Sequence, residues 1–185
     1  MMRMQYKRRA QLKTNYRRRL RLLLGRKDRI VVRKSISGFS IQLVRYSESG
    51  DQTFVEVSTK HLREHGWKGH GGSIPSAYLT GFLFGKTAAK KGFGSGVIDF
   101  GQESVSQSLL AAALGARDAG IDVPVGAEVP EERIKGLHIA EYARKMKGSE
   151  PENYKKRFSA YLKNGLAPEN IPEHFEEVKK TLEGL

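Results

Sequence analysis

The first 27 residues of the chain contain no aspartate or glutamate, and the whole chain contains no cysteine. The same segment contains eleven arginine and lysine side chains, so all of its formal side-chain charge has one sign. A folded surface normally mixes both signs, because a dense run of one sign repels itself. The missing cysteines exclude disulfides and thiolate metal sites, and they are compatible with a reducing cytoplasm.

Long hydrophobic runs are also missing. No stretch reaches the roughly 20 apolar residues that a membrane-spanning helix needs, and the longest aliphatic run near the start, Leu22–Leu24, is too short for the core of a signal peptide. Mitochondrial transit peptides are arginine-rich and acid-poor, but they are also rich in serine, and residues 1–27 contain none. We therefore interpret this segment as a basic arm.

The charge that is present has one dominant sign. The chain of 185 residues carries a formal net charge of +13, which indicates a polyanionic partner such as nucleic acid or an anionic membrane surface. Composition divides the chain into three segments. We expect a basic arm at 1–27, an α/β domain at 28–125 and a helical C-terminal extension at 126–185.

Apolar residues of the arm recur at helical spacing, at Leu12, Tyr16, Leu20 and Leu23 or Leu24. This spacing predicts a helix that docks through one narrow apolar stripe, with the arginines fanned around it. Gly25 is expected to end the helix. Residues before Leu12 have no such stripe, and we expect them to be disordered until bound.

Three strands are predicted after the arm, over residues 29–33, 39–43 and 53–58. In the second, apolar and polar residues alternate, so one face of the sheet should be buried and the other open. The segment 47–51 between the last two strands is typical of a hairpin loop. We therefore expect an antiparallel sheet edge.

Glycine and proline are frequent in residues 59–75, which predicts a loop. Ser76 is then expected to cap a helix that runs to Lys91 and ends at Gly92. Small residues recur every four positions on one face of this helix, at Ala77, Gly81, Gly85 and Ala89. We expect this small-residue stripe to let the helix lie close to the sheet.

The remaining segments complete an alternating pattern. A short strand over 96–100 is followed by a helix from Ser104 or Ser106 to Ala119, which is typical of an α/β fold with crossover connections. The extension should form helices over 130–147, 151–164 and 171–184. We therefore predict a small mixed sheet with antiparallel strands and crossover helices, a basic N-terminal arm and a helical C-terminal extension.

Catalytic and metal-binding patterns are weak. The segment 81–87 places three residues between its glycines, where a phosphate-binding loop has four. His61 and His65 have helical spacing but no third ligand that we can name, and we favour surface or nucleic-acid-contacting histidines over a metal pair. We expect no enzyme activity and no cofactor. A metal-dependent nuclease, which would need carboxylates such as Asp99 to converge on a metal, stays an alternative.

Basic residues continue past the arm onto the sheet, the glycine-rich loop and the end of the helix at Lys91. Glycines in a basic loop allow the backbone to approach phosphates closely. Trp67, Tyr6 and Tyr16 can stack on unpaired bases, although Trp67 is equally well explained as a core anchor. The candidate nucleic-acid-binding residues are Arg3, Lys7, Arg8, Arg9, Lys13, Tyr16, Arg17, Arg18, Arg19, Arg21, Arg33, Lys34, Ser35, Trp67, Lys68, His70, Lys86, Lys90 and Lys91.

A succession of short segments resembles the large-subunit ribosomal proteins that bind 5S rRNA, the universal family numbered eighteen, in its archaeal form. The matching pieces are residues 6–9 with 16–19, 29–35, 66–69, 77–86, 118–124 and 130–142. One departure is the stretch 102–108, which lacks the arginine expected near the start of the following helix. We therefore expect no RNA contact from that stretch.

The resemblance implies a non-enzymatic protein of the large subunit that binds 5S rRNA and attaches it to the large rRNA in the central protuberance. The arm, the strand end at Arg33–Ser35 and the loop at Trp67 would face RNA. The implied partners are 5S rRNA, large-subunit rRNA and neighbouring ribosomal proteins, including the one numbered five, with no membrane. The implied location is the cytoplasm, in the ribosome. Another nucleic-acid-binding protein and a membrane-surface protein that uses the leucine stripe of the arm stay as alternatives.

Overall fold

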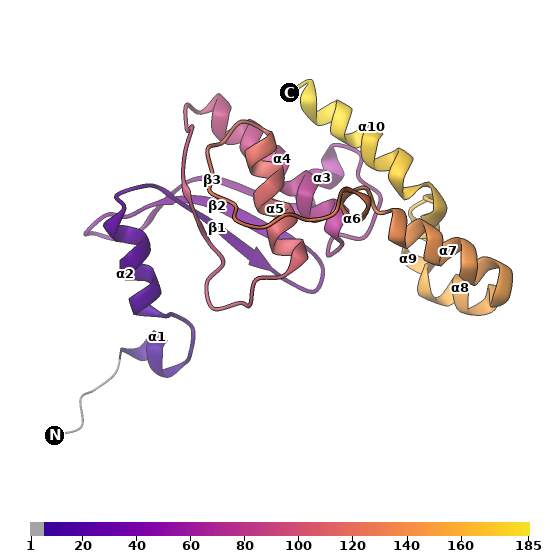
Figure 1. Cartoon of the computed structure of the whole chain (residues 1–185), viewed down its shortest axis with the longest axis horizontal. Helices are drawn as coiled ribbons and strands as arrows, with labels where there is room; N and C mark the ends of the chain where they lie inside the picture. The colour runs from indigo at the N-terminus through magenta and orange to yellow at the C-terminus, as the bar shows by residue number, and fades with distance from the viewer. Residues whose placement is uncertain (1–5) are drawn as a thin grey trace.

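A four-stranded mixed sheet forms the centre of the molecule in the computed structural model, which describes residues 6–185. The strand order is β3-β2-β1-β4. The basic arm and the C-terminal helices lie toward opposite ends of the long axis (Figure 1). This architecture confirms the predicted α/β fold class. The strands are β1 (Arg29–Lys34), β2 (Phe39–Arg45), β3 (Gln52–Ser58) and β4 (Val97–Asp99).

The sheet combines a predicted antiparallel half with one parallel pairing. β1 pairs antiparallel with β2, and β2 pairs antiparallel with β3, which confirms the expected sheet edge. β4 pairs parallel with β1 on the opposite side, so the chain must cross the sheet between β3 and β4. Alternate residues such as Ile30, Ile41 and Val55 are fully buried beneath the crossover helices.

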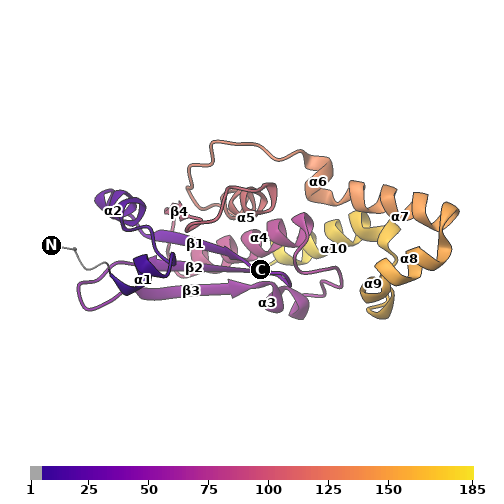
Figure 2. The same cartoon turned by 90° about the horizontal axis from the view of Figure 1, so that it is seen from below.

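Two long helices, α4 (Ile74–Lys90) and α5 (Gln107–Asp118), cover one face of the sheet, as Figure 2 shows. The expectation that the small-residue stripe of α4 faces the sheet is wrong. A Cβ added at Gly81 would overlap the carbonyl oxygen of Ala112 in α5, and one at Gly115 would overlap that of Tyr78 in α4. The glycines therefore let the two helices approach each other.

The glycine-rich segment is shorter than predicted, because a helix α3 (Thr59–Glu64) lies within the expected loop. Its start is a capping box in which the backbone N–H of Ser58 donates to Nδ1 of His61, 3.1 Å away. Buried Leu62 anchors the helix. The following helix begins at Ile74 and not at Ser76, since Ser73 is the residue whose side chain caps it. Its predicted end at Gly92, with φ of +81°, is confirmed.

The C-terminal segment contains more and shorter helices than predicted. Gly136, with φ of +81°, breaks the first expected helix, and a bend at Phe158 breaks the second. Phe175 and Leu182 of the last helix join the main core beside the sheet and α4. The elements are α6 (Glu131–Lys135), α7 (Leu137–Ser149), α8 (Pro151–Arg157), α9 (Ser159–Lys163), the 3-10 turn η1 (Pro168–Asn170) and α10 (Ile171–Glu183).

The arm folds differently from the prediction. It forms two helices, α1 (Lys7–Ala10) and α2 (Tyr16–Leu24), separated by Leu12 in a left-handed conformation. The expectation of disorder before Leu12 is therefore wrong for α1, and Arg3 lies outside the described residues. The leucine stripe does not dock, since Leu20 and Leu24 are 60% and 73% exposed. Among residues 6–185, no helix has the length and apolar character required to cross a bilayer.

Candidate nucleic-acid interface

The arm lies over the face of the sheet that α4 and α5 leave uncovered. Arg29, Val31 and Arg33 of β1 alternate with the buried residues Ile30 and Val32, so they point toward this open face. A cavity of about 290 Å³, which we call the arm cavity, separates the open face from the arm. Its charged lining residues are Arg8, Lys13, Arg18, Arg19, Arg29, Arg33, Asp51 and Asp99.

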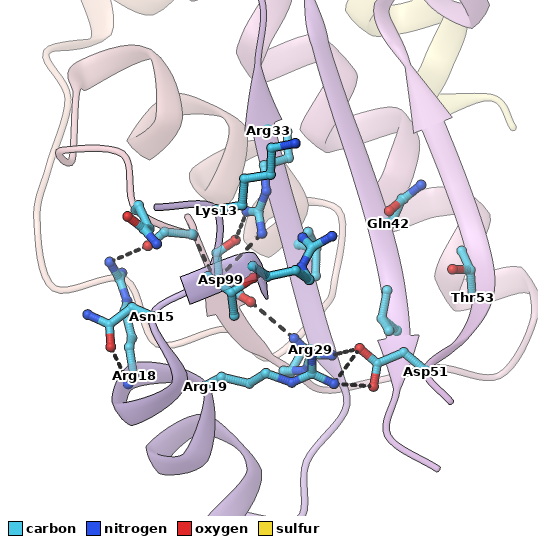
Figure 3. Close-up of a pocket in the computed structure, with 16 residues that line it drawn as sticks. Lys13, Asn15, Arg18, Arg19, Arg29, Arg33, Gln42, Asp51, Thr53 and Asp99 are labelled. Carbon is cyan, nitrogen blue, oxygen red and sulfur yellow. Dashed lines mark hydrogen bonds and ion pairs between the residues drawn. The ribbon is translucent and has the colours of Figure 1, made fainter. Parts of the chain in front are cut away.

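Arg29 is the centre of an ion-pair network at one wall of the arm cavity (Figure 3). Its Nη2 donates to Oδ2 of Asp51 at 2.6 Å, and its Nη1 donates to Oδ2 of Asp99 at 3.2 Å. The side chain is only 6% exposed, so both carboxylates are needed to offset its desolvation. Its Nε is buried without a hydrogen-bond partner among the described residues.

Arginines attach the arm to the domain by polar contacts. Arg19 of α2 donates through Nη2 to both carboxylate oxygens of Asp51, each 3.0 Å away. Arg18 donates to the carbonyl oxygen of Gly101 at 2.7 Å. The β2–β3 hairpin and the turn after β4 therefore hold one end of the arm by polar contacts.

A second cavity of about 350 Å³ continues along the open face at the β1–β2 turn, and we call it the turn cavity. Arg33 lines both cavities and thus joins them. Lys34, Lys60 and Arg63 line the turn cavity, and no acidic residue does. The two cavities together form a basic track across one side of the molecule. This arrangement suits a chain of phosphates better than a single small molecule.

The β1–β2 turn also lies against the glycine-rich loop. Ser35 closes the turn by accepting from the N–H of Gly38 at 3.1 Å. A Cβ at Gly71 or Gly72 would press on the carbonyl oxygens of this turn, so only glycine allows the loop to approach so closely. The exposed residues Lys68 and His70 of the loop are thereby held near the turn.

Trp67 belongs to the core. Of the two interpretations of this residue, a core anchor or a ring that stacks on RNA bases, the structure therefore favours the core anchor. It is 3% exposed, and its ring stacks on His174 of α10 with centroids 5.2 Å apart. The backbone N–H of Lys68 donates to Nε2 of His174 at 3.1 Å, and the side chain of Asn164 donates to the Lys68 carbonyl at 3.0 Å. His174 and Asn164 of the C-terminal extension therefore hold the glycine-rich loop in place. The Trp67 ring is not available to stack on a base in this conformation.

His174 should make the stability of this region depend on pH. Burial lowers the pKa of His174 below its ordinary value of 6.5, although Glu177 opposes the shift. Between the folded-state pKa and 6.5, the unfolded chain binds more protons than the folded chain. The free energy of unfolding should therefore decrease as pH falls below 6.5 and level off below the folded-state pKa.

Melting curves at a series of pH values, followed by the fluorescence of the only tryptophan, test this prediction. The variant His174→Gln retains a hydrogen-bond acceptor but does not titrate, so its pH dependence should be shallower in this window. Burial also lowers the pKa of His138. His138 is present in both the parent chain and the variant, so the difference between their pH dependences reports His174 alone. Parallel curves for the variant and the parent chain would contradict the assignment.

The cluster at the end of α4 lies apart from the basic track. Lys86 donates to the carbonyl oxygen of Glu183 at 3.1 Å, and Lys91 donates to that of Phe54 at 3.0 Å. Lys90 is exposed. None of the three lines the arm cavity or the turn cavity.

The remaining arm candidates Lys7, Arg9, Arg17 and Arg21 are exposed, and the ring of Tyr16 contacts the ring of Tyr6, with 5.1 Å between the centroids.

The three segments differ sharply in net charge. Residues 126–185 contain eleven acidic and eleven basic side chains, so the entire excess of +13 lies in residues 1–125. The arm alone supplies eleven of these charges. The open face and its arm are therefore the part of the protein to which a polyanion is most strongly attracted.

Asp99, the carboxylate of the nuclease alternative, has a structural role. It lies between Arg29 and Arg33 and also accepts from the backbone N–H of Gly101 at 2.8 Å. No group of three or more histidine, aspartate or glutamate side chains in residues 6–185 is arranged to hold a metal ion. His61 caps α3, as described above. The ion pairs of Asp99 with Arg29 and Arg33 therefore indicate that its carboxylate positions these two arginines.

Sequence reasoning missed Arg29, Asp51 and His174 as parts of the interface. Period-two alternation from Arg33 back to Arg29 would have placed both on one strand face. No local signal identifies Asp51, because its partners Arg19 and Arg29 lie 32 and 22 residues away. His174 lies 106 residues from Lys68.

A family model described as ribosomal large subunit proteins 60S L5 and 50S L18 matches residues 1–105 of this chain. The matched part includes the arm, β1 to β4, α4 and every charged residue that lines the two cavities.

Proposed function

Because this chain belongs to the family of ribosomal large-subunit proteins 60S L5 and 50S L18, we propose that it binds 5S rRNA and attaches it to the large rRNA in the central protuberance. Its place is in the large ribosomal subunit, and its family is one of structural proteins and not of enzymes. The observation that carries the proposal is the acid-free arm, folded over an open sheet face to form a basic track.

Binding follows from phosphate neutralisation by this track. Arg8, Lys13 and Arg18 surround the arm cavity, while Lys34, Lys60 and Arg63 surround the turn cavity. Contacts to phosphates set affinity and orientation, and shape or exposed bases supply specificity for RNA. Ile36 at the tip of the β1–β2 turn is 95% exposed and offers an apolar contact for an unpaired base.

The proposal assigns the remaining candidates by their position. The exposed arm residues Lys7, Arg9, Arg17 and Arg21 extend the track beyond the sheet. Lys68 and His70 add donors beside the turn. Lys86, Lys90 and Lys91 lie elsewhere, and we assign them to a second RNA segment, in keeping with a protein that joins two RNAs. Neighbouring large-subunit proteins, including the one numbered five, are the proposed protein partners.

Filter binding tests this proposal with the purified full-length chain, labelled 5S rRNA and a structured control RNA of equal length. At about 0.15 M salt, where non-specific binding is weak, 5S rRNA should bind at least tenfold more tightly than the control. A second assay mixes labelled 5S rRNA with large-subunit rRNA, and comigration of the two should require the protein. Equal affinity for both RNAs would contradict 5S recognition, and comigration without the protein would contradict the attachment role.

A further inference from the structure

The charges around the arm cavity are unequally matched. Six cationic side chains line it against the two carboxylates of Asp51 and Asp99. These carboxylates pair with Arg19, Arg29 and Arg33. The other three cations, Arg8, Lys13 and Arg18, form no ion pair within the described part of the chain, and the five residues before it contain no acid. The side chains that line the cavity therefore carry more positive than negative charge.

The polar contacts of the two arginines among these cations use only part of their donors. Arg8 donates through Nε to the hydroxyl of Thr14 at 2.9 Å. Arg18 uses Nη1 for the carbonyl oxygen of Gly101. A guanidinium carries five N–H donors, so both arginines retain donors for a ligand. An anion between them would receive charge-assisted hydrogen bonds, which are the strongest class.

Asp51 keeps the two walls of the cavity together. It accepts from Arg19 of the arm and from Arg29 of β1, so one carboxylate links α2 to the sheet. Arg29 is in turn fixed by Asp99. Figure 3 shows Arg19 and Arg29 converging on Asp51 at the edge of the cavity. An acidic side chain thus positions the basic residues of the arm over the open face.

We propose that the arm cavity is a binding site for one phosphodiester group of the RNA, and that Asp51 is a positioning residue which assembles this site. The inference rests on the proposed function and deepens it by naming where a phosphate is held. A phosphate is favoured over a protein carboxylate because the site opens through Arg33 onto the turn cavity, which has only cationic charged residues. A phosphate chain can follow that track from one cavity to the next.

The proposal makes a prediction opposite in sign to simple electrostatics. Removing an acid from an RNA-binding surface ordinarily strengthens binding, because repulsion of the phosphates falls. Asp51→Asn removes one negative charge but also releases Arg19 and weakens the hold on Arg29. We expect the affinity of the full-length chain for 5S rRNA to fall by about tenfold, comparable to one lost charge-assisted hydrogen bond.

Glu48→Gln is the matched control for this experiment. Glu48 is exposed on the same hairpin and makes no ion pair in the described part of the chain. This substitution should leave the affinity unchanged or raise it slightly. A melting curve confirms that each variant is folded. If Asp51→Asn binds 5S rRNA as tightly as the parent chain or more tightly, the role of Asp51 is overturned.

A second measurement addresses the phosphate itself without RNA. Inorganic phosphate, compared with chloride at equal ionic strength, should raise the melting temperature of the parent chain. The double variant Arg8→Gln and Lys13→Gln should lose this rise. The variant Arg26→Gln and Lys27→Gln removes the same charge from exposed arm positions that do not line the cavity, and it should keep the rise. Equal responses of the two double variants would overturn the site.

The two proposals fail in distinguishable ways. A parent chain that does not bind 5S rRNA overturns the proposed function. If the parent chain binds 5S rRNA and Asp51→Asn binds it equally well, only the role of Asp51 is overturned; if the parent chain binds 5S rRNA and the two double variants respond equally to phosphate, only the phosphate site is overturned. Competition by polyglutamate as effective as that of an RNA of equal charge would overturn the assignment to phosphate.

Discussion

Deletion of residues 1–27 is expected to weaken binding of 5S rRNA by about a hundredfold or more at physiological salt, because each lost phosphate contact reduces affinity severalfold. The deletion removes eleven positive charges, and these include Arg8, Lys13 and Arg18 of the arm cavity. Its effect on folding should be small. The arm is attached mainly by Arg18 and Arg19 at partly exposed positions, and such contacts contribute about 1 kcal/mol or less each.

Filter binding and melting curves on the same preparation of the deleted chain measure both effects. The variant Leu20→Ser and Leu24→Ser is the control, since it changes two exposed apolar residues of the arm and no charge. It should bind 5S rRNA like the parent chain. A loss of stability in proportion to the loss of RNA affinity would show that the arm belongs to the core. Loss of tight binding in the leucine variant would favour the alternative in which the leucine stripe is the contact surface.

Gly81→Ala is expected to lower the free energy of unfolding by about 1 to 3 kcal/mol, the range seen when a close-packed core is overfilled. Alanine normally stabilises a helix relative to glycine. Here its Cβ would overlap the carbonyl oxygen of Ala112, so α4 and α5 would have to separate. Because a chain of this length loses about 2 to 4 °C of melting temperature per kcal/mol, the expected decrease is easily measured.

Gly148→Ala makes the same substitution in α7, where no atom lies within 4 Å of the added Cβ. It should raise the stability by up to about 1 kcal/mol. If the free energy of unfolding falls in Gly81→Ala and rises in Gly148→Ala, then glycine is required at position 81 by the contact between α4 and α5 and not by helix propensity. A stabilising effect of Gly81→Ala would contradict the close approach of α4 and α5.

Much of the fold could be predicted from local sequence patterns. Alternation in β2 correctly gave one buried and one open face, since Ile41 and Leu43 are buried while Gln42 lines the arm cavity. Glycines past helix ends, such as Gly92, correctly marked the end of α4. These features depend on residues within a few positions of each other, which is the distance over which a single sequence is informative.

The errors concern partners that are distant in sequence. The small-residue stripe at Gly81 and Gly85 indicates a close contact, but it does not distinguish α5 from the sheet as the partner, because both surfaces accept a close approach. In the arm, the spacing of Leu20 and Leu24 predicted apolar docking, yet Arg19 reaches Asp51 instead. Periodicity reports which residues share a face and not which face is buried.

In the candidate interface, too, local sequence features were predictable and partners distant in sequence were not. The cations of the arm, Arg33 and Lys34 were identified from charge alone, and the structure places Arg8, Lys13 and Arg33 around one cavity. The acids that organise them were missed, since a search for polyanion-binding residues counts positive charges. Trp67 had two interpretations, and only the stacking on His174 decided between them.

The salt dependence of 5S rRNA binding tests the central claim, that the arm and the open face neutralise phosphates. The logarithm of the binding constant should fall linearly with the logarithm of salt concentration, by about 0.7 to 0.9 units for each phosphate neutralised. The account predicts a steep slope for the full-length chain and a slope shallower by several units for the chain that lacks residues 1–27. A flat slope for the full-length chain, or equal slopes for the two chains, would contradict it.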